Sequence, residues 1–356
     1  MGFFSSAHTK QSYIGLDIGA SGIKLVELQN EKGRARLVTY AYAALPSQDL
    51  ESALNQDSAL VGAFMKKMIQ KAKCATKLTI AALPISSVFS SIISVPATNE
   101  KELQEAILWQ AKKLIPVPLE DITLDSKTID TVGSGDGGKK MTRVLLTGAP
   151  KGLVSKYLDL AKQAGLELIS LETEAFAQIR SLIGKDRSSI MLIDIGSSRT
   201  NISIIDRGIP FLNRSIATGG YAITQAIAKT LGIPFEQAES MKRDIRAMQQ
   251  FSQAGDLSPM LTLLLKPILD EVRYSFNLYQ GQTAEGQPRH VDKIILTGGA
   301  ALLPRLPEFM TSLMNVNTYL GDPWARVVYP VDLRPILDDI GPRFTVAIGC
   351  AMRDIE

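Results

Sequence analysis

The chain has 356 residues, of which 45% are hydrophobic, and its 39 basic and 36 acidic residues give a formal charge of +3. This length predicts two domains with substantial cores, and the balanced charge argues against a nucleic-acid-binding protein. The chain contains two cysteines, Cys74 and Cys350, and two histidines, His8 and His290. These few residues exclude a disulfide framework and nearly exclude a histidine-based metal site or a Ser-His-Asp triad.

The hydropathy pattern gives a first indication of where the protein works. No apolar run reaches the roughly 18 residues that a membrane span needs, and no signal peptide is visible. Two isolated thiols are typical of a reducing compartment. We therefore expect a cytoplasmic protein that does not itself span a membrane.

The first part of the chain alternates between strand and helix signals. Three strands with tight connections are expected over 13–17, 23–29 and 36–43, because short apolar runs are separated by glycine-rich turns. A helix over 51–73 follows, with apolar residues at helical spacing. A buried strand over 77–84 ends at Pro84.

The segment 85–170 has a different texture. We expect a strand over 88–95 and then a helix over 99–115, with Asn99 as its N-cap and Glu102 completing a capping box. The stretch "PVPLED" then breaks that helix. Two further strands are expected after it.

The rest of this segment completes a small α+β unit. Leu103, Ile107 and Leu114 are expected to form the apolar stripe of its first helix. The polar stretch 133–138 predicts a hairpin loop between the two strands, and a second helix over 151–165 is closed by glycine. The order β-α-β-β-α therefore suggests an inserted subdomain.

The second half of the chain opens like the first. "LDIGASGIKLVEL" (16–28) and "LIDIGSSRTNISII" (192–205) share an aspartate at a strand end and a turn of small residues, and the offset from Asp17 to Asp194 is 177 residues. We interpret the repeat as a pseudo-twofold arrangement with a site between the halves. Three strands from residue 188 are then expected to be followed by helices over 220–231, 235–250 and 258–281, a strand over 291–299, and helices over 304–314 and 344–353.

The turns of small residues fit phosphate groups. A glycine-rich turn exposes consecutive N–H groups and lacks the Cβ atoms that would block an anion. Two such hairpins facing each other can hold a chain of phosphates, and Lys24 would add a point charge. The predicted phosphate-binding residues are Gly19, Ala20, Ser21 and Lys24 in the first loop and Gly196, Ser197 and Ser198 in the second.

The two aspartates point to a divalent cation. A carboxylate beside a triphosphate is repelled unless a cation lies between them, so Asp17 and Asp194 are placed to hold Mg²⁺, partly through water. The alternative is that each aspartate merely caps a turn. The repetition of the whole arrangement favours the Mg²⁺ interpretation.

A third glycine motif ends an apolar strand in "IILTGGAALLP" (294–304). Gly298, Gly299 and Ala300 would let an adenine or a ribose lie flat against the backbone. The alternative is a strand-to-helix turn that simply needs glycine.

Together these motifs resemble the superfamily of actin, sugar kinases and heat-shock chaperones. The resemblance implies that Ala217–Gly220 is the first connection between the domains and that 341–352 is the second. It also implies a cofactor contact through Gly219 and Gly220, and a ribose or base contact through Glu239 and Lys242. Glu172, in "ETEAFA", would position the attacking water, and Asp194 and Asn201 would complete the catalytic group.

The inserted unit narrows the resemblance to one branch. The segment 85–170 is similar to the subdomain of the division protein FtsA and of the PilM family of type IV pilus assembly proteins. A helix ending in Ile-Pro-x-Pro and followed by an acidic pair resembles the PilM family. FtsA carries a C-terminal amphipathic membrane helix, whereas this chain ends in "GCAMRDIE", directly after the second connection.

The resemblance implies an α/β, actin-like (duplicated ribonuclease H-like) two-domain fold with an inserted α+β subdomain. The expected divisions are a first domain over 1–84, completed by 171–186 and 335–356, an inserted subdomain over 85–170, and a second domain over 187–334.

The implied function is that of a scaffold that binds ATP and Mg²⁺ at the cytoplasmic side of the inner membrane. As a PilM-family protein it would bind the N-terminal cytoplasmic peptide of PilN, in a groove between the inserted subdomain and the first domain, and it would couple to other pilus and motor components. Because actin has a histidine where this chain has Asn201, slow ATP turnover at most is expected.

Two other functions stay open. A small-molecule kinase of the same superfamily would need a general base facing the acceptor hydroxyl, and no aspartate-containing acceptor loop is visible between the phosphate loops. A filament-forming, FtsA-like protein is the other alternative, so homo-oligomerisation is left open.

Overall fold

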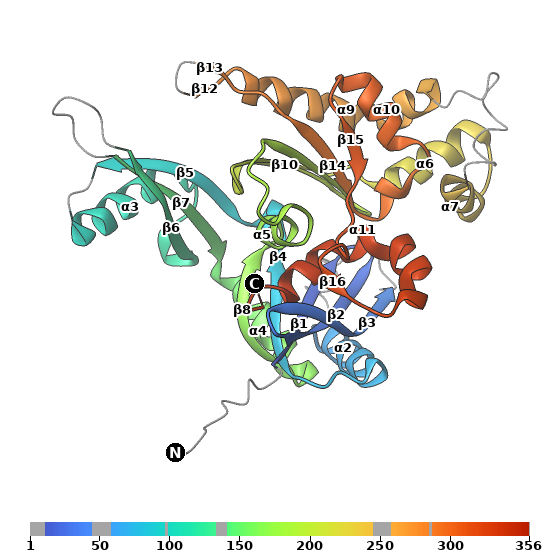
Figure 1. Ribbon diagram of the computed structural model, residues 1–356, viewed down its shortest axis with the longest axis horizontal. Coiled ribbons are helices and arrows are strands. Elements are labelled where there is room, and N and C mark those ends of the chain that lie inside the picture. The colour runs from blue at the N-terminus through green and yellow to red at the C-terminus, as the bar shows by residue number, and fades with distance from the viewer. Residues whose placement is uncertain are drawn as a thin grey trace.

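Two mixed β-sheets form the centres of two lobes, and a third sheet projects from the first lobe (Figure 1). The computed structural model describes residues 11–44, 58–96, 99–132, 141–244, 258–284 and 287–355. None of the helices in these ranges is long and apolar enough to cross a membrane.

The first lobe contains a six-stranded sheet in the order β16-β3-β2-β1-β4-β8. The first three strands form an antiparallel meander, and β4 and β8 continue the sheet in parallel. The strands are β1 (Ser12–Gly19), β2 (Gly22–Glu31), β3 (Arg34–Ala44), β4 (Leu78–Leu83), β8 (Glu167–Thr173) and β16 (Val327–Val328).

The second lobe repeats this order in a five-stranded sheet, β11-β10-β9-β14-β15. It again has an antiparallel meander extended by two parallel strands, so the two sheets match strand by strand from β3–β8 to β11–β15. The duplication expected from the sequence is therefore confirmed. Its strands are β9 (Ile190–Ile195), β10 (Thr200–Asp206), β11 (Ile209–Ile216), β14 (Lys293–Thr297) and β15 (Thr318–Leu320).

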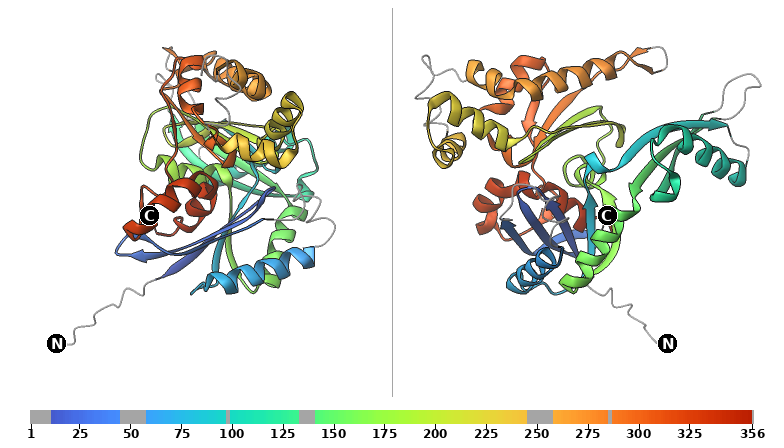
Figure 2. Two further views of the ribbon diagram at one scale, coloured as in Figure 1. Left: turned by 90° about the vertical axis from the view of Figure 1, so that its right-hand side faces the viewer. Right: turned by 180° about the vertical axis from the view of Figure 1, so that it is seen from behind.

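Helices cover both faces of the first sheet, because its central strands carry apolar side chains on both faces. Ile14 and Leu16 of β1 pack with α2 and α4, whereas the next face packs on α11, as the left panel of Figure 2 shows. Gly15 permits this close packing, since a methyl group there would lie 1.8 Å from the carbonyl oxygen of Ala347. The helices are α2 (Ser58–Ala72), α3 (Glu100–Leu114), α4 (Lys151–Ala164), α5 (Glu174–Gln178), α6 (Gly220–Leu231), α7 (Phe235–Arg243), α9 (Ser258–Gln280), α10 (Leu306–Met314) and α11 (Arg334–Ala351).

In the second lobe, α6, α7, α9 and α10 bury one face of the sheet in the largest apolar cluster of the described residues. The π-helical turn η3 (Ile179–Ile183) packs on the other face. The remaining short elements are η1 (Ile85–Ser87), η2 (Leu119–Asp121), η4 (Gly299–Leu302), η5 (Val331–Leu333) and the small hairpin β12 (Thr283–Ala284) and β13 (Gln287–Pro288).

The projecting unit is an antiparallel sheet in the order β5-β7-β6, with α3 against one face. Asn99 caps α3 as expected, since its side-chain oxygen accepts a hydrogen bond from the Glu102 amide at 3.0 Å. The expected apolar stripe is wrong at Leu114, which is 41% exposed, whereas Ala111 is buried in its place. The strands are β5 (Phe89–Pro96), β6 (Ile122–Val132) and β7 (Met141–Pro150), and the expected hairpin loop lies outside the described residues.

The packing of α4 bears on where the inserted unit ends. Tyr157, Leu160 and Ala161 of this helix are buried with α2 in the core of the first lobe. A division at residue 170 would separate α4 and β8 from the sheet against which they pack. We therefore propose that the inserted unit ends at Pro150.

The chain crosses between the lobes at different places from those expected. The first crossing is α5 and η3, which lead from β8 to β9. The expectation for Ala217–Gly220 is wrong, because these residues join β11 to α6 within the second lobe. The chain returns between β15 and β16, and α11 then packs on β1 and β2 of the first lobe and on η4 of the second.

Two helix boundaries also differ from the expected ones. α11 begins at Arg334 and continues through Pro342, whereas the sequence pattern predicted a start near residue 344. α7 ends at Arg243, and the remainder of the helix expected up to residue 250 lies almost wholly outside the described residues.

Candidate functional site

The two aspartates lie at equivalent strand ends. In the first lobe Asp17 of β1 stands opposite Lys24 of β2, and in the second Asp194 of β9 stands opposite Asn201 of β10. The repeat therefore places a lysine and an asparagine at matching positions. Because both strand ends face the junction of the lobes, the sequence repeat has become a site with pseudo-twofold symmetry.

Lys24 is held over the first glycine turn. Its ammonium lies 3.1 Å from Asp17 Oδ2, and both side chains are about nine-tenths buried. Burial alone would lower the lysine pKa, but the charge of Asp17 outweighs it and raises the pKa of Lys24. A methyl group at Gly19 would lie 2.8 Å from Lys24 Nζ, so a side chain there would displace the ammonium.

Asp194 is fixed from both sides. Gln178 Nε2 of α5 donates a hydrogen bond to Asp194 Oδ2 at 2.6 Å. On the other side a methyl group at Gly298 would lie 2.3 Å from Asp194 Oδ1, so the loop at 298–300 requires glycine to approach the carboxylate. Burial and the charge of Asp17 raise the pKa of Asp194 to about 6, although Lys24 and Gln178 oppose the rise.

A third carboxylate in the site is Glu174, the first residue of α5. Its Oε2 accepts hydrogen bonds from the Ile85 amide at 3.1 Å and from Asn201 Nδ2 at 3.2 Å. Burial and the charges of Asp17 and Asp194 raise the pKa of Glu174 to about 8. It thus links the first crossing to both lobes.

Glu172, the residue expected to position water, is engaged elsewhere. Both of its oxygens accept hydrogen bonds from the Arg180 guanidinium at 2.8 Å, and Arg180 also donates to the Gly349 carbonyl. The structure therefore brings Glu174, rather than Glu172, to Asn201.

The second glycine turn is tied to the start of α6. The Gly220 amide donates to the Gly196 carbonyl at 2.8 Å, and the Tyr221 amide donates to the Ser197 carbonyl at 2.9 Å. A methyl group at Gly219 would lie 2.6 Å from the Ser197 carbonyl oxygen. Ser198 is exposed, next to this contact. Gly219 and Gly220 therefore support the second glycine turn, although they do not connect the lobes.

Glu239 and Lys242 form a second polar cluster beside the glycines. Lys242 Nζ donates to Glu239 Oε2 at 2.6 Å, to Thr224 Oγ1 at 2.7 Å and to the Gly220 carbonyl at 3.1 Å. Burial opposes the ionisation of Glu239, yet Lys242 and Thr224 outweigh it and lower the Glu239 pKa to about 2. A methyl group at Gly220 would lie 3.0 Å from Ala300 Cβ, which places the cluster beside the loop at 298–300.

The charges of the site suit a cation together with an anion. Three carboxylates, Asp17, Asp194 and Glu174, interact with one ammonium, that of Lys24. Across the described residues, no group of three or more His, Cys, Asp or Glu side chains is arranged to hold a metal ion by itself. A divalent cation would therefore need water or phosphate oxygens to complete its ligands.

A family model described as type IV pilus assembly protein PilM matches residues 15–355. The chain belongs to the PilM family. Among solved structures it is similar to a PilM–PilN type IV pilus biogenesis complex, with 25% identity over 97% of this chain and 98% of that chain and a TM-score of 0.79.

Two more distant structures share the fold of this PilM-family chain. EutJ, an ethanolamine utilization protein from Carboxydothermus hydrogenoformans, is 16% identical over 96% of this chain and 89% of that chain, with a TM-score of 0.54. MreB5 of Spiroplasma citri, bound to ADP, is 15% identical over 95% and 94% of the two chains, with a TM-score of 0.51. They support an actin-like fold.

Several residues of the PilM-family site were missed in the sequence. Glu174 could have been found from its position directly after β8. Residues at the carboxyl ends of parallel strands often form the binding site of an α/β fold. Gln178 and Thr224 have no such signal, since a single amide or hydroxyl on a helix is usually a local capping or surface group.

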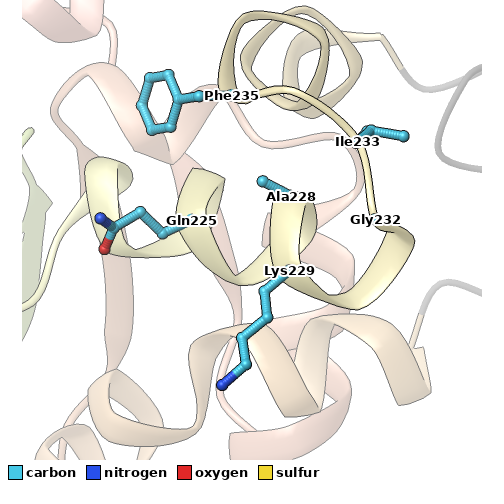
Figure 3. Close-up of a pocket in the computed structure, with 6 residues that line it drawn as sticks. All are labelled: Gln225, Ala228, Lys229, Gly232, Ile233 and Phe235. Carbon is cyan, nitrogen blue, oxygen red and sulfur yellow. The ribbon is translucent and has the colours of Figure 1, made fainter.

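A surface hollow of this PilM-family chain lies where α6 meets α7. It is lined by Gln225, Ala228, Lys229, Gly232, Ile233 and Phe235, around the turn between α6 and α7 (Figure 3). None of these side chains is among the residues that approach the aspartates. The hollow therefore does not enter the assignment of the site.

Proposed function

We propose that the chain is an ATP-binding, actin-like scaffold of the type IV pilus inner-membrane assembly complex. The observation that carries this proposal is the pair of matched hairpins that bring Asp17, Lys24, Asp194 and Asn201 to one junction between two lobes. The family assignment supports the pilus role, and the actin-like fold supports a nucleotide in the cleft.

In this proposal Mg-ATP lies between the two glycine turns. The amides of Gly19–Ser21 and Gly196–Ser198 would face the phosphates, and Lys24 would add a positive charge. Asp17 and Asp194 would hold the hydrated Mg²⁺, which lowers the repulsion between these carboxylates and the triphosphate. The Glu239–Lys242 cluster and Gly298–Ala300 would surround the nucleoside.

The residues support slow hydrolysis at most. Glu174 and Asn201 can exchange hydrogen bonds with a water molecule near the terminal phosphate. Because the pKa of Glu174 is raised to about 8, its carboxyl is mostly protonated near neutral pH and can accept a proton in only a minor fraction of the protein, which agrees with slow hydrolysis. We therefore propose Glu174, in place of Glu172, as the residue that orients the water.

The partner proposal concerns the space between the inserted unit and the first lobe. Strand β8 is at the edge of its sheet and β6 is at the edge of the inserted sheet, so each offers unpaired backbone groups among the described strands. Leu158 of α4 and Ile169 of β8 are 49% and 40% exposed. We propose that the N-terminal peptide of PilN binds here by strand addition, which would hold the protein at the inner membrane.

The nucleotide site is tested by calorimetry with Mg-ATP. Lys24→Ala and Asp194→Ala should each weaken binding by about 1–3 kcal/mol, because each removes a charge-assisted contact. Asp338→Ala, at a surface carboxylate on α11 paired with Arg334, is the control and should bind like the parent. Unchanged affinity in both cleft variants would refute the site.

A further inference from the structure

Helix α11 is fastened at a proline to the loop around Gly298, Gly299 and Ala300, the proposed nucleoside loop. The Pro342 carbonyl accepts a hydrogen bond from the Gly298 amide at 2.9 Å and another from Thr297 Oγ1 at 3.2 Å. Thr345 Oγ1 lies 2.7 Å from Thr297 Oγ1, one turn further along the helix. These bonds fix how far α11 stands from the glycines.

The next residue, Arg343, lies over the same loop. A methyl group at Gly299 would lie 3.5 Å from both Cγ and Nε of Arg343, so the arginine stem runs across the bare glycine backbone. The side chain is half-buried. Among the residues that the structure describes, no hydrogen bond or ion pair engages its guanidinium, whereas Arg334 on the same helix pairs with Asp338.

The surroundings of Arg343 carry an excess of positive charge. The pKa of Lys242 is lowered first by burial, and the positive charge of Arg343 also contributes to lowering it. Lys242 has a carboxylate partner in Glu239, but Glu239 is shared with Arg243. An unpaired guanidinium held beside a bare backbone therefore has a free planar face and an environment that favours an electron-rich ligand.

We propose that Arg343 stacks its guanidinium on the purine base of the bound nucleotide. This proposal rests on the proposed nucleotide site and adds a residue to it. Because α11 packs on the first sheet, Arg343 gives the base a contact from the first lobe, while Gly299, Lys242 and Glu239 belong to the second. The base would thereby join the two lobes, independently of the phosphates.

Calorimetry with two ligands separates a base contact from a phosphate contact. Mg-ATP carries the base, and Mg-tripolyphosphate lacks it; the affinity of the latter is measured by its competition with ATP, so that weak binding still gives a value. Arg343→Ala should weaken ATP binding roughly 5- to 30-fold and leave tripolyphosphate binding within about twofold. Arg343→Lys should recover little of the loss, because it restores the charge but not the plane.

Arg334→Ala is the matched control, since it removes an arginine from the same helix at a surface ion pair. Unchanged ATP affinity in Arg343→Ala would overturn the proposal, and so would an equal loss for tripolyphosphate. If Lys24→Ala weakens binding and Arg343→Ala does not, the base contact alone is wrong. If the parent protein does not bind Mg-ATP, the proposed function fails with it.

Discussion

Asp17, Asp194 and Glu174 place more negative charge at the lobe junction than Lys24 can neutralise. The protein responds by favouring the protonated forms of two of them, with the pKa raised to about 6 for Asp194 and about 8 for Glu174. Ionising these groups in the free protein costs free energy, because burial removes the water that would solvate them. A ligand that brings Mg²⁺ would lower this cost.

The sign of this effect gives a prediction for Glu174→Gln. A carboxyl whose pKa rises on folding stabilises the protein below its unfolded pKa, and this contribution is lost as the pH rises towards about 8. Glutamine cannot ionise, so the melting temperature of the variant, relative to the parent, should increase between pH 5 and pH 9. Melting curves without nucleotide at several pH values test this.

Glu172→Gln is the control for that measurement. It breaks the paired hydrogen bonds to Arg180, so it should lower the melting temperature at every pH instead of improving it at high pH. A difference between Glu174→Gln and the parent that stays constant from pH 5 to pH 9 would contradict the electrostatic account.

The same two glutamates give a prediction for turnover. Hydrolysis of ATP by the parent should be well below about 10 per second, and Glu174→Gln should reduce it further. Glu172→Gln should retain it, provided that the variant is folded. Release of phosphate in single-turnover experiments measures both. Rapid consumption of ATP, or phosphorylation of a sugar, would favour a kinase or a motor.

At the residue scale, the sequence could predict that the aspartates and the glycines meet at the junction of the lobes, but not which glutamate lies beside them. Asp17 and Asp194 stand in a repeated pattern, and each pattern confirms the other. "ETEAFA" contains two glutamates, and nothing local shows that Arg180 occupies the first. That ion pair depends on η3 folding back towards β8, which is a tertiary contact.

At the scale of elements, the second phosphate loop depends on its contact with the start of α6. The chain approaches itself so closely at Gly219 that a methyl group would lie 2.6 Å and 2.7 Å from two backbone carbonyl oxygens. Backbone cannot move aside as a flexible side chain can. The geometry of the loop is therefore coupled to the position of the helix.

Gly219→Ala should therefore disturb both stability and nucleotide binding. We expect a loss of about 1–3 kcal/mol in the free energy of unfolding and weaker binding of Mg-ATP, because the loop must shift to accept the methyl group. Denaturant unfolding and calorimetry measure the two effects.

Gly152→Ala on α4 is the matched control, since a methyl group there meets nothing within 4 Å. It should leave nucleotide binding unchanged and should not lower stability, because alanine favours helix over glycine. If Gly219→Ala behaves like this control, the loop and the helix are not coupled.

The elements themselves were predicted best where their periodicity was clean. The two meanders alternate apolar and polar residues or are buried throughout, and their strands lie where expected. The start of α11 was missed because Gly341 and Pro342 are usually helix-breaking residues. The Pro342 carbonyl accepts hydrogen bonds from Thr297 and Gly298 of the other lobe, a tertiary contact that the local sequence does not show.

At the scale of the whole molecule, the duplication brings the two glycine turns to the junction of the lobes, and the inserted unit adds a separate surface. The boundaries of that unit could not be predicted from the order of elements alone. α4 follows β7 in the chain, yet its apolar face is buried against α2, in the core of the first lobe. The core against which α4 packs is decided by tertiary contacts, which the order of the elements does not show.

The ends of the inserted sheet show how the unit can be removed cleanly. Phe89 at the start of β5 pairs with Gly148 near the end of β7, so the chain enters and leaves the unit side by side. Replacing residues 89–148 with a short glycine-serine linker should therefore leave the first lobe intact, with α4 and β8 in place. The unit has its own apolar core, so that core is removed together with the unit.

This deletion tests the proposed partner surface. The variant should bind Mg-ATP with the affinity of the parent, because the cleft residues Asp17, Lys24 and Asp194 are untouched. It should lose most of its affinity for the N-terminal peptide of PilN, because the edge of β6 is gone and only β8 remains to pair with an extended chain. The parent should bind that peptide with micromolar affinity, since a disordered segment loses entropy when it becomes ordered.

Fluorescence anisotropy of a labelled peptide measures the affinity of both proteins, and a scrambled peptide is the control for non-specific binding. A deletion variant that binds Mg-ATP normally and keeps full affinity for the peptide would place the partner surface elsewhere.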